Sequence, residues 1–508
     1  MQINRQLTFR SIIFVIGILS IGWATGCADQ TAEENQSQTL PPPGVRTSQP
    51  QETNTITPTE DLVIEPDPAD EGASPFEAGK SKYEFGTESH HMDFQNEGEL
   101  FEESGVQLIR HNALIWQKVE PEEGDRQWDA VADLEVKLSG ASANGLSTIL
   151  IVRGTPTWAQ KVPGSGCGPI TQEKLESFAS FMVDAVNRFG GPPYNVKYWE
   201  LGNEPDVDPS LVGPNSVFGC WGDNYDPYYG GGYYAEMLKV VYPAIKAADP
   251  EAKVLIGGLL LDCDPTNPPE GLVCLPGNFL EGILINGGGD FFDYVSFHGY
   301  IPYTGPAFGG GGLHYEQHLP NWEHRGGGVT GKIDFIQEML AKYNLDMPII
   351  HTEGSLICPE WNTSQCNPPV DAFYEAQADY VVRLYVQNWA DDLFGTIWYQ
   401  FEGPGWRFGG LLDEDQNPRL SFEALSFLTM ELTEVNYIGE VTQYESLVGY
   451  KFSNPDKQIW IIWSPDELET QIQLPENLSA VFNKYGEDIT PLGREITVSS
   501  PIYVEINP

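Results

Sequence analysis

Along most of the chain, apolar runs of strand length alternate with stretches in which apolar residues recur at helical spacing. Eight runs are predicted as strands: Tyr83–Thr87, Gly105–Ile115, Leu146–Thr155, Val196–Asp206, Lys253–Leu261, Phe292–Tyr300, Pro348–Gly354 and Gly395–Phe401. Helical spacing between and after them predicts helices over Ala130–Ala143, Thr171–Phe189, Tyr233–Ala248, Phe279–Ile285, Lys332–Tyr343, Phe373–Ala390 and Ser421–Leu432. This order is typical of a parallel α/β fold.

Eight predicted strands that alternate with predicted helices in one stretch predict a (β/α)8 TIM barrel, which we expect to occupy residues 76–434. The near-continuous apolar run in Leu146–Thr155 fits a strand that is covered on both faces. A doubly wound sheet is the alternative, but no Gly-rich phosphate turn follows any of the predicted strands.

The pattern changes after the last predicted helix. Short alternating runs are separated there by Pro, Asp, Asn and Gly, and they predict a small antiparallel, sandwich-like accessory β domain over residues 435–508. The expected strands are Leu447–Ser453, Gln458–Ser464, Thr470–Leu474 and Ile502–Ile506.

Residues 1–27 have the pattern of a targeting segment. Arg5 and Arg10 precede an apolar core, Ser11–Trp23, and Ala24-Thr25-Gly26-Cys27 follows it. The segment resembles a bacterial lipoprotein signal, with Ala24 where Leu or Val is commoner. The resemblance implies cleavage before Cys27, a lipid anchor on Cys27, and a lipoprotein of the cell surface or periplasm. The alternative is an ordinary signal peptide cut nearby, with Cys27 incidental.

Residues 28–75 are rich in Thr, Pro, Gln and Glu, and contain no aromatic residue and one basic residue, Arg46. Such a composition buries too little apolar surface to offset the entropy of ordering the chain. We therefore predict a disordered acidic tether between the anchor and the folded domain.

Charge and cysteine content narrow the function further. The chain has 27 Lys and Arg against 73 Asp and Glu, a formal net charge of −46, which argues against nucleic acid and anionic membrane surfaces as partners.

Besides Cys27 there are six cysteines in loop-like surroundings, an even number that favours disulfides in an oxidising compartment. Six cysteines allow fifteen pairings. Pairing the nearest neighbours gives Cys263–Cys274 and Cys358–Cys366 and leaves Cys167–Cys220; a metal site is the rival, but no CxxC pair occurs.

Two predicted strands end in a glutamate. Glu204 follows Asn203 at the end of the fourth strand, and Glu353 follows Thr352 at the end of the seventh. Because a sheet interior excludes an unpaired charge, each glutamate is expected to face the C-terminal mouth of the barrel. Two facing carboxylates, one protonated and one ionised, are what glycosidic cleavage needs.

These motifs resemble glycoside hydrolase clan A, the retaining barrel glycosidases, with families 39 and 5 as the nearest. The resemblance covers about Tyr83 to Glu431. It implies that Glu204 is the acid/base and Glu353 the nucleophile. It also implies a set of substrate-binding residues, in which Asn203 binds the sugar 2-hydroxyl and Tyr300 supports Glu353: Arg110, Asn203, His298, Tyr300 and Trp398.

The resemblance therefore implies a hydrolase that cleaves β-glycosidic bonds in a poly- or oligosaccharide by double displacement, without cofactor or metal. A non-catalytic surface carbohydrate-binding protein and a transglycosidase on the same scaffold are the alternatives. His314 and His318 have a spacing that fits a metal, but their glycine-rich surroundings favour a mobile subsite loop. The glycan, endo or exo action and the oligomeric state stay open.

Overall fold

The computed structural model describes residues 83–213, 216–303, 321–359 and 366–507. The chain divides into two units, Met1–Pro75 and Phe76–Pro508, and all described residues belong to the second. The predicted signal segment with Cys27, the predicted tether and His314–His318 lie outside the described residues. In the part of the chain that is described, none of the helices combines the length and the apolar character needed to cross a membrane.

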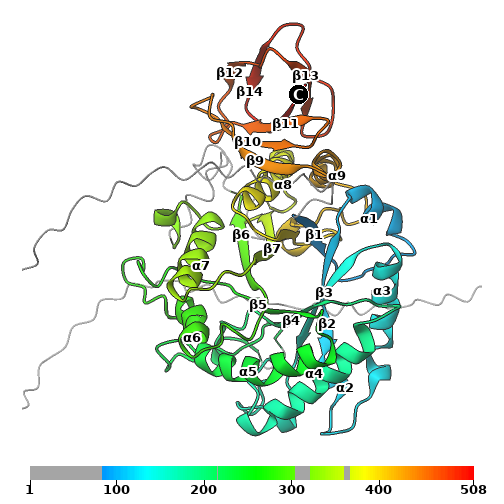
Figure 1. Cartoon of the computed structure of the whole chain (residues 1–508), viewed down its shortest axis with the longest axis vertical. Coiled ribbons are helices and arrows are strands. Elements are labelled where there is room, and N and C mark those ends of the chain that lie inside the picture. Colours follow the sequence, from blue (N-terminus) through cyan, green and yellow to red (C-terminus); the bar gives the residue numbers. More distant parts are fainter. Residues whose placement is uncertain (1–82, 214–215, 304–320, 360–365, 508) are drawn as a thin grey trace, which may run out of the picture. The chain divides into compact units, whose positions relative to one another are not determined.

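Eight parallel strands form the central barrel (Figure 1). They are β1 (Glu84–Glu88), β2 (Leu108–Ile115), β3 (Ser147–Arg153), β4 (Tyr198–Asn203), β5 (Lys253–Gly258), β6 (Val295–Pro302), β7 (Ile349–Ile357) and β8 (Gly395–Trp398). Their hydrogen-bonded order is β5-β4-β3-β2-β1-β8-β7-β6, and parallel bridges from Leu255 to Tyr294 and from Leu259 to Phe297 join the two ends of this order. The predicted (β/α)8 barrel with a smaller β domain is confirmed.

Helices follow the strands around the barrel (Figure 1). All seven predicted helices are present, with bounds shifted by a few residues at most. Two further short helices, α1 (Gly98–Ser104) and α2 (Trp116–Val119), were not predicted. The helices are α1 (Gly98–Ser104), α2 (Trp116–Val119), α3 (Ala132–Ala143), α4 (Leu175–Phe189), α5 (Gly231–Ala248), α6 (Phe279–Ile285), α7 (Thr330–Lys342), α8 (Asp371–Ala390) and α9 (Leu420–Leu432).

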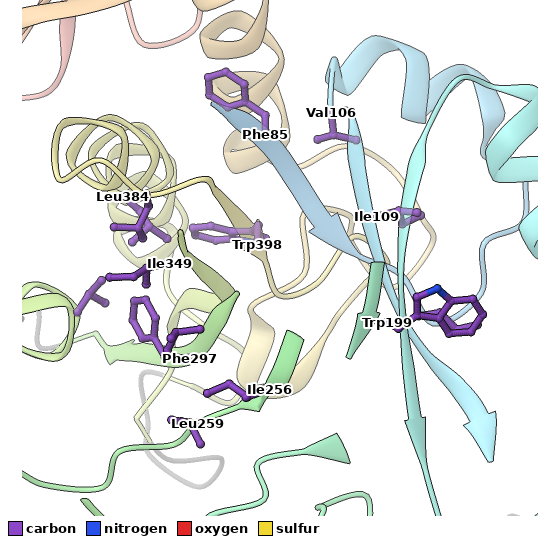
Figure 2. Packing of buried hydrophobic residues seen from close by; sticks show 14 of the residues in the cluster. Phe85, Val106, Ile109, Trp199, Ile256, Leu259, Phe297, Ile349, Leu384 and Trp398 are labelled. Atoms are coloured by element: carbon purple, nitrogen blue, oxygen red, sulfur yellow. The ribbon is translucent and has the colours of Figure 1, made fainter. Parts of the chain in front are cut away.

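Side chains on each strand alternate between the barrel interior and the helical layer. A small interior cluster consists of Leu108, Ile149, Leu255, Tyr294, Ile350 and Ile397. Their strand neighbours, such as Ile109 and Trp398, belong to the large cluster between strands and helices, which Figure 2 shows together with Leu384 of α8. Polar side chains toward the C-terminal ends of the strands therefore face the mouth when they are in phase with the interior cluster.

The C-terminal residues form two antiparallel sheets, of order β13-β15-β11-β10-β9 and β12-β14. The strands are β9 (Asn436–Glu440), β10 (Val448–Ser453), β11 (Gln458–Trp463), β12 (Thr470–Gln473), β13 (Leu478–Asn483), β14 (Glu495–Val498) and β15 (Ile502–Ile506). The larger sheet packs on α8 and α9 (Figure 1), where Phe427 contacts Phe482 and Tyr503. Lys484 forms a 2.6 Å ion pair with Asp379 of α8.

Three disulfides brace loops that follow the C-terminal ends of strands. Cys167–Cys220 joins the loop after β3 to the loop after β4. Cys263–Cys274 lies within the loop after β5, and Cys358–Cys366 begins directly after β7. The nearest-neighbour pairing is thus the one found, and every cross-link limits the freedom of loops at the barrel mouth.

Candidate active site

Glu204 lies at the turn that ends β4. Gly202 and Glu204 both have left-handed backbone angles, with φ of +93° and +53°, a conformation that a glutamate adopts at some cost in energy. Next to it, Asp206 anchors the turn by accepting hydrogen bonds from the backbone N–H groups of Leu260 and Leu261 at 3.0 and 2.9 Å. The Glu204 side chain is buried, with 6% of the residue exposed. The turn holds the carboxyl in a dry position at the barrel mouth.

His298 of β6 contacts the Glu204 carboxyl. The two groups meet at 2.7 Å between His298 Nδ1 and Glu204 Oε1. Burial, then the positive charge of Arg110, lowers the pKa of His298 well below its ordinary value, so the ring is neutral. The imidazole packs against Gly258 of β5, where an added Cβ would lie 2.0 Å from Nε2. A neutral ring protonated on Nδ1 therefore donates to Glu204 in either ionisation state of that carboxyl.

Glu353 of β7 accepts two strong hydrogen bonds. Arg110 Nη1 donates to one carboxyl oxygen, and the Tyr300 hydroxyl donates to the other. Both donors favour the ionised carboxylate. The support of Glu353 by Tyr300 that the resemblance implied is present as this contact.

Arg110 is the centre of a buried network that links four strands. Its Nε donates to Glu200 at 2.6 Å, Nη2 donates to Asn203 Oδ1 at 2.8 Å, and Nη1 donates to Glu88 as well as Glu353. The side chain has no exposed surface. By accepting from Arg110, the Asn203 amide is oriented with its NH₂ group near Glu204, at 3.5 Å.

The two glutamates are close enough to act on one bond. Oxygen atoms of Glu204 and Glu353 lie within 4.8 Å of one another and of a His298 ring nitrogen. Carboxyl groups of retaining glycosidases are about 5–5.5 Å apart, and those of inverting enzymes about 6.5–9.5 Å. A separation within 4.8 Å between one oxygen of each carboxyl agrees better with the shorter spacing of retaining enzymes than with that of inverting ones.

The same three groups are the ones, among the described residues, that could share a metal ion. Two carboxylates and one imidazole suit a divalent transition metal. In this structure their oxygen atoms are engaged instead by Arg110, Tyr300 and His298. A cation would compete with these hydrogen bonds.

The two carboxyls differ in their tendency to ionise. Burial, then the charges of Glu353 and Asp206, raises the pKa of Glu204 well above its ordinary value. Burial also raises the pKa of Glu353, to about 7, while Arg110 and the Tyr300 hydroxyl oppose the rise. Glu353 therefore loses its proton first, and Glu204 keeps one at neutral pH.

Six of the seven residues predicted for the site meet at the barrel mouth, and Trp398 does not. Trp398 is fully buried on the outer side of β8, where its indole donates to Gly409 O at 2.8 Å (Figure 2). The interior position falls to the next residue, Tyr399, because Ile397 faces inward. The centroid of the Tyr399 ring lies 5.8 Å from that of the Tyr300 ring, and the centroid of the Trp406 ring lies 4.9 Å from it.

Sequence reasoning missed two carboxylates of the site, Glu88 and Glu200. Glu200 lies within β4, where we expected the sheet interior to exclude a charge; Arg110, Ser296 and the Gly258 N–H satisfy it there. Glu88 ends β1, one residue beyond the predicted strand, and also contacts His90 at 3.1 Å. Both could have been found from the alternation of side chains along a strand. Each glutamate stands at a position whose side chain faces the barrel interior.

Comparison with known proteins supports the fold. No family model matches the chain, and no curated protein does. Among solved structures, a family 39 glycoside hydrolase from Bacteroides cellulosilyticus WH2 is similar with a TM-score of 0.61 and 20% identity, over 84% of this chain and 81% of that one.

Two further similar structures belong to other families. A family 30 endoxylanase from Clostridium papyrosolvens C71 has a TM-score of 0.53 and 11% identity, over 85% of this chain and 98% of its own. A family 51 alpha-L-arabinofuranosidase from Bifidobacterium longum has a TM-score of 0.54 and 13% identity, over 86% of this chain and 98% of its own. At these identities the likeness establishes the fold, a (β/α)8 barrel, and no more.

Proposed function

We propose that this protein is a retaining glycoside hydrolase that acts by double displacement. The observation that carries the proposal is the pair of buried carboxyls whose oxygens lie within 4.8 Å, with Arg110 and Tyr300 on Glu353 and His298 on Glu204. Likeness of fold alone would not suffice, since one barrel supports many reactions.

In the first step, a Glu353 oxygen attacks the anomeric carbon and forms a glycosyl ester. The bond to the leaving oxygen breaks, and the Glu204 proton moves to that oxygen. In the second step, Glu204 takes a proton from water, the water oxygen attacks the same carbon, and the ester bond to Glu353 breaks. Asn203, oriented by Arg110, is the group we assign to the sugar 2-hydroxyl.

The change of role of Glu204 follows from the charges around it. While Glu353 is ionised, burial and that negative charge keep Glu204 protonated. Once Glu353 is esterified its charge is gone, so the pKa of Glu204 falls and the carboxyl can serve as a base.

We further propose that the enzyme works outside the cytoplasm, anchored through a lipid on Cys27. The three disulfides support an oxidising compartment. We also propose that the cleaved bond has the β-configuration. The similar structures do not decide this point, because they include both an endoxylanase and an alpha-L-arabinofuranosidase.

The test is hydrolysis of a panel of α- and β-aryl glycosides and polysaccharides by the purified protein, with Glu353→Gln as control. We expect cleavage of one class, with turnover lost in the control while its thermal unfolding stays cooperative. Products longer than the substrate would indicate a transglycosidase. Binding of a glycan without cleavage of any panel member would instead indicate a carbohydrate-binding protein.

Tyr300→Phe is expected to move the acid limb of the pH–rate profile. The reaction needs ionised Glu353, whose pKa is raised to about 7, so kcat/KM should fall as pH drops below about 7. Removing the Tyr300 hydroxyl removes a bond to the ionised form and raises this pKa further. The limb should therefore shift to higher pH. Tyr444→Phe, which alters a hydroxyl on Gln473 O in the C-terminal sheets, should leave it in place; an unmoved limb in Tyr300→Phe would contradict the role of Tyr300.

A further inference from the structure

Arg153 ends β3 and faces the barrel mouth. It is in phase with Ile149 of the interior cluster, four residues earlier on the same strand. The register pairs Arg153 with Ile115 of β2, and pairs Val152 with Leu201 of β4. Its backbone therefore lies beside Gly202, roughly 5 Å away across the strands, and two residues before Glu204 along β4. Arg153 and Glu204 therefore lie near the same end of two neighbouring strands.

Among the described residues, one side-chain contact fixes the orientation of the Arg153 guanidinium. Its Nε donates to Asn112 Oδ1 of β2 at 2.6 Å. Among the described residues, no acceptor lies within hydrogen-bond distance of the two terminal nitrogens, and no carboxylate lies within ion-pair distance. Three buried carboxylates of the site, Glu88, Glu200 and Glu353, are bound to Arg110 instead. One edge of a planar guanidinium thus presents two N–H donors to the mouth.

The excess of acidic residues in the chain makes an arginine without a carboxylate partner a candidate for ligand binding. The chain carries 73 acidic against 27 basic residues, yet no carboxylate of the described residues forms an ion pair with Arg153. Arg153 is largely enclosed, and this burial lowers its pKa to about 10, with Glu88 opposing the shift. It remains a cation at neutral pH and carries a desolvation cost that no ion pair of the described residues offsets. A ligand that brings the missing negative charge would offset it.

We propose that Arg153 binds an anionic group, a uronate carboxylate or a sulfate ester, on the sugar residue next to the bond that is cleaved. The substrate class of the enzyme is then an acidic glycan. This inference rests on the proposed glycosidase function and deepens it. The two terminal N–H groups match two oxygens of a carboxylate or a sulfate in a bidentate pair, and Asn112 sets the plane of that pair. A local cation is also what an anionic substrate needs in order to enter a protein of net charge −46.

The experiment compares kcat/KM for matched acidic and neutral substrates. Aryl glycosides of a neutral sugar, of its uronic acid and of its sulfate ester are assayed with the wild-type protein, Arg153→Gln and Arg153→Lys. We expect Arg153→Gln to lower the acidic-to-neutral ratio of kcat/KM by about 10- to 100-fold, the effect of losing a charge-assisted hydrogen-bonded pair. Arg153→Lys keeps the positive charge but loses the paired N–H donors of the guanidinium. Its acidic-to-neutral ratio of kcat/KM should therefore lie between those of the wild type and Arg153→Gln. The uronate and sulfate arms identify which anion is bound.

Arg188→Gln is the matched control, because Arg188 pairs with Glu135 on the outer surface, and its ratio should equal that of the wild type. An equal fall with acidic and neutral substrates in Arg153→Gln would overturn the proposal, since Arg153 would then only balance charge in the mouth. A wild-type preference for neutral substrates would overturn it too.

Failure of the proposed function is distinguishable by calorimetry. Titration with oligosaccharides from alginate, carrageenan and laminarin measures binding without cleavage. If the protein hydrolyses nothing but binds an acidic oligosaccharide through Arg153, the glycosidase proposal fails and the anion site stands. If it cleaves neutral glycans and binds acidic ones no better, the anion site fails alone.

Discussion

Arg110→Met should lower the free energy of unfolding by about 3–5 kcal/mol, the usual result of removing one partner from a buried ion pair. Glu88, Glu200 and Glu353 all accept from this one guanidinium, and all three are buried. Methionine fills much of the volume but leaves the three carboxyls without their cation. Chemical unfolding with the disulfides intact measures the loss.

The pH dependence of this loss has a definite sign. Without Arg110, the carboxyls have higher pKa values in the folded protein than in the unfolded chain, so the folded form binds more protons. Stability then falls as pH rises through these pKa values. The deficit of Arg110→Met relative to wild type should therefore be larger at pH 8 than at pH 5.

Arg188→Met is the matched control for Arg110→Met. Its ion pair with Glu135 lies at the surface, with 37% of the arginine side chain exposed, and such pairs contribute about 0–1 kcal/mol. Arg110→Lys retains a positive charge without the several N–H donors of a guanidinium. Its loss in free energy of unfolding should lie between those of Arg110→Met and Arg188→Met. Equal losses in Arg110→Met and Arg188→Met would show that the buried network does not stabilise the barrel.

The sequence allowed the barrel to be predicted because its evidence is local. Eight apolar runs of strand length alternate with stretches of helical spacing, and both glutamates that end strands were visible as breaks in those runs. Asn203, His298 and Tyr300 were placed by resemblance, and the structure brings them to within contact of one or both glutamates or their partners.

The rest of the site depends on which face of a strand each side chain occupies and on ion pairs between distant strands. A single sequence shows both poorly. Trp398 was assigned in place of Tyr399 because the two are adjacent aromatic residues, and one residue of register changes the face of a strand. Glu88, Glu200 and Arg153 sit in strands 1, 4 and 3, and the pairing of the two glutamates with Arg110 follows only from closure of the barrel. Such charges look unfavourable in a strand until their partners on other strands are known.

Glu204→Gly and Glu353→Ala should leave the enzyme inactive in different ways, and sodium azide should reveal the difference. Glu353→Ala lacks the nucleophile, and we expect a loss on the order of 10⁶-fold in turnover, as when the nucleophile is removed from another covalent enzyme. Glu204→Gly lacks the acid/base, whose contribution is about 10²–10⁴-fold. Glycine fits the left-handed backbone at position 204, where φ is +53°, so the turn should be preserved.

The product formed with azide reports which residue is which. With an aryl glycoside whose leaving group needs no proton, Glu204→Gly still forms the ester on Glu353, and azide then attacks the anomeric carbon from the opposite face. The glycosyl azide keeps the configuration of the substrate. In Glu353→Ala, azide occupies the space of the missing carboxylate and displaces the leaving group directly, so the product is inverted. Nuclear magnetic resonance of the two azides distinguishes these outcomes. Exchanged configurations would reverse the assignment, and an absence of azide product from both variants, with wild-type cleavage intact, would rule out double displacement at this pair.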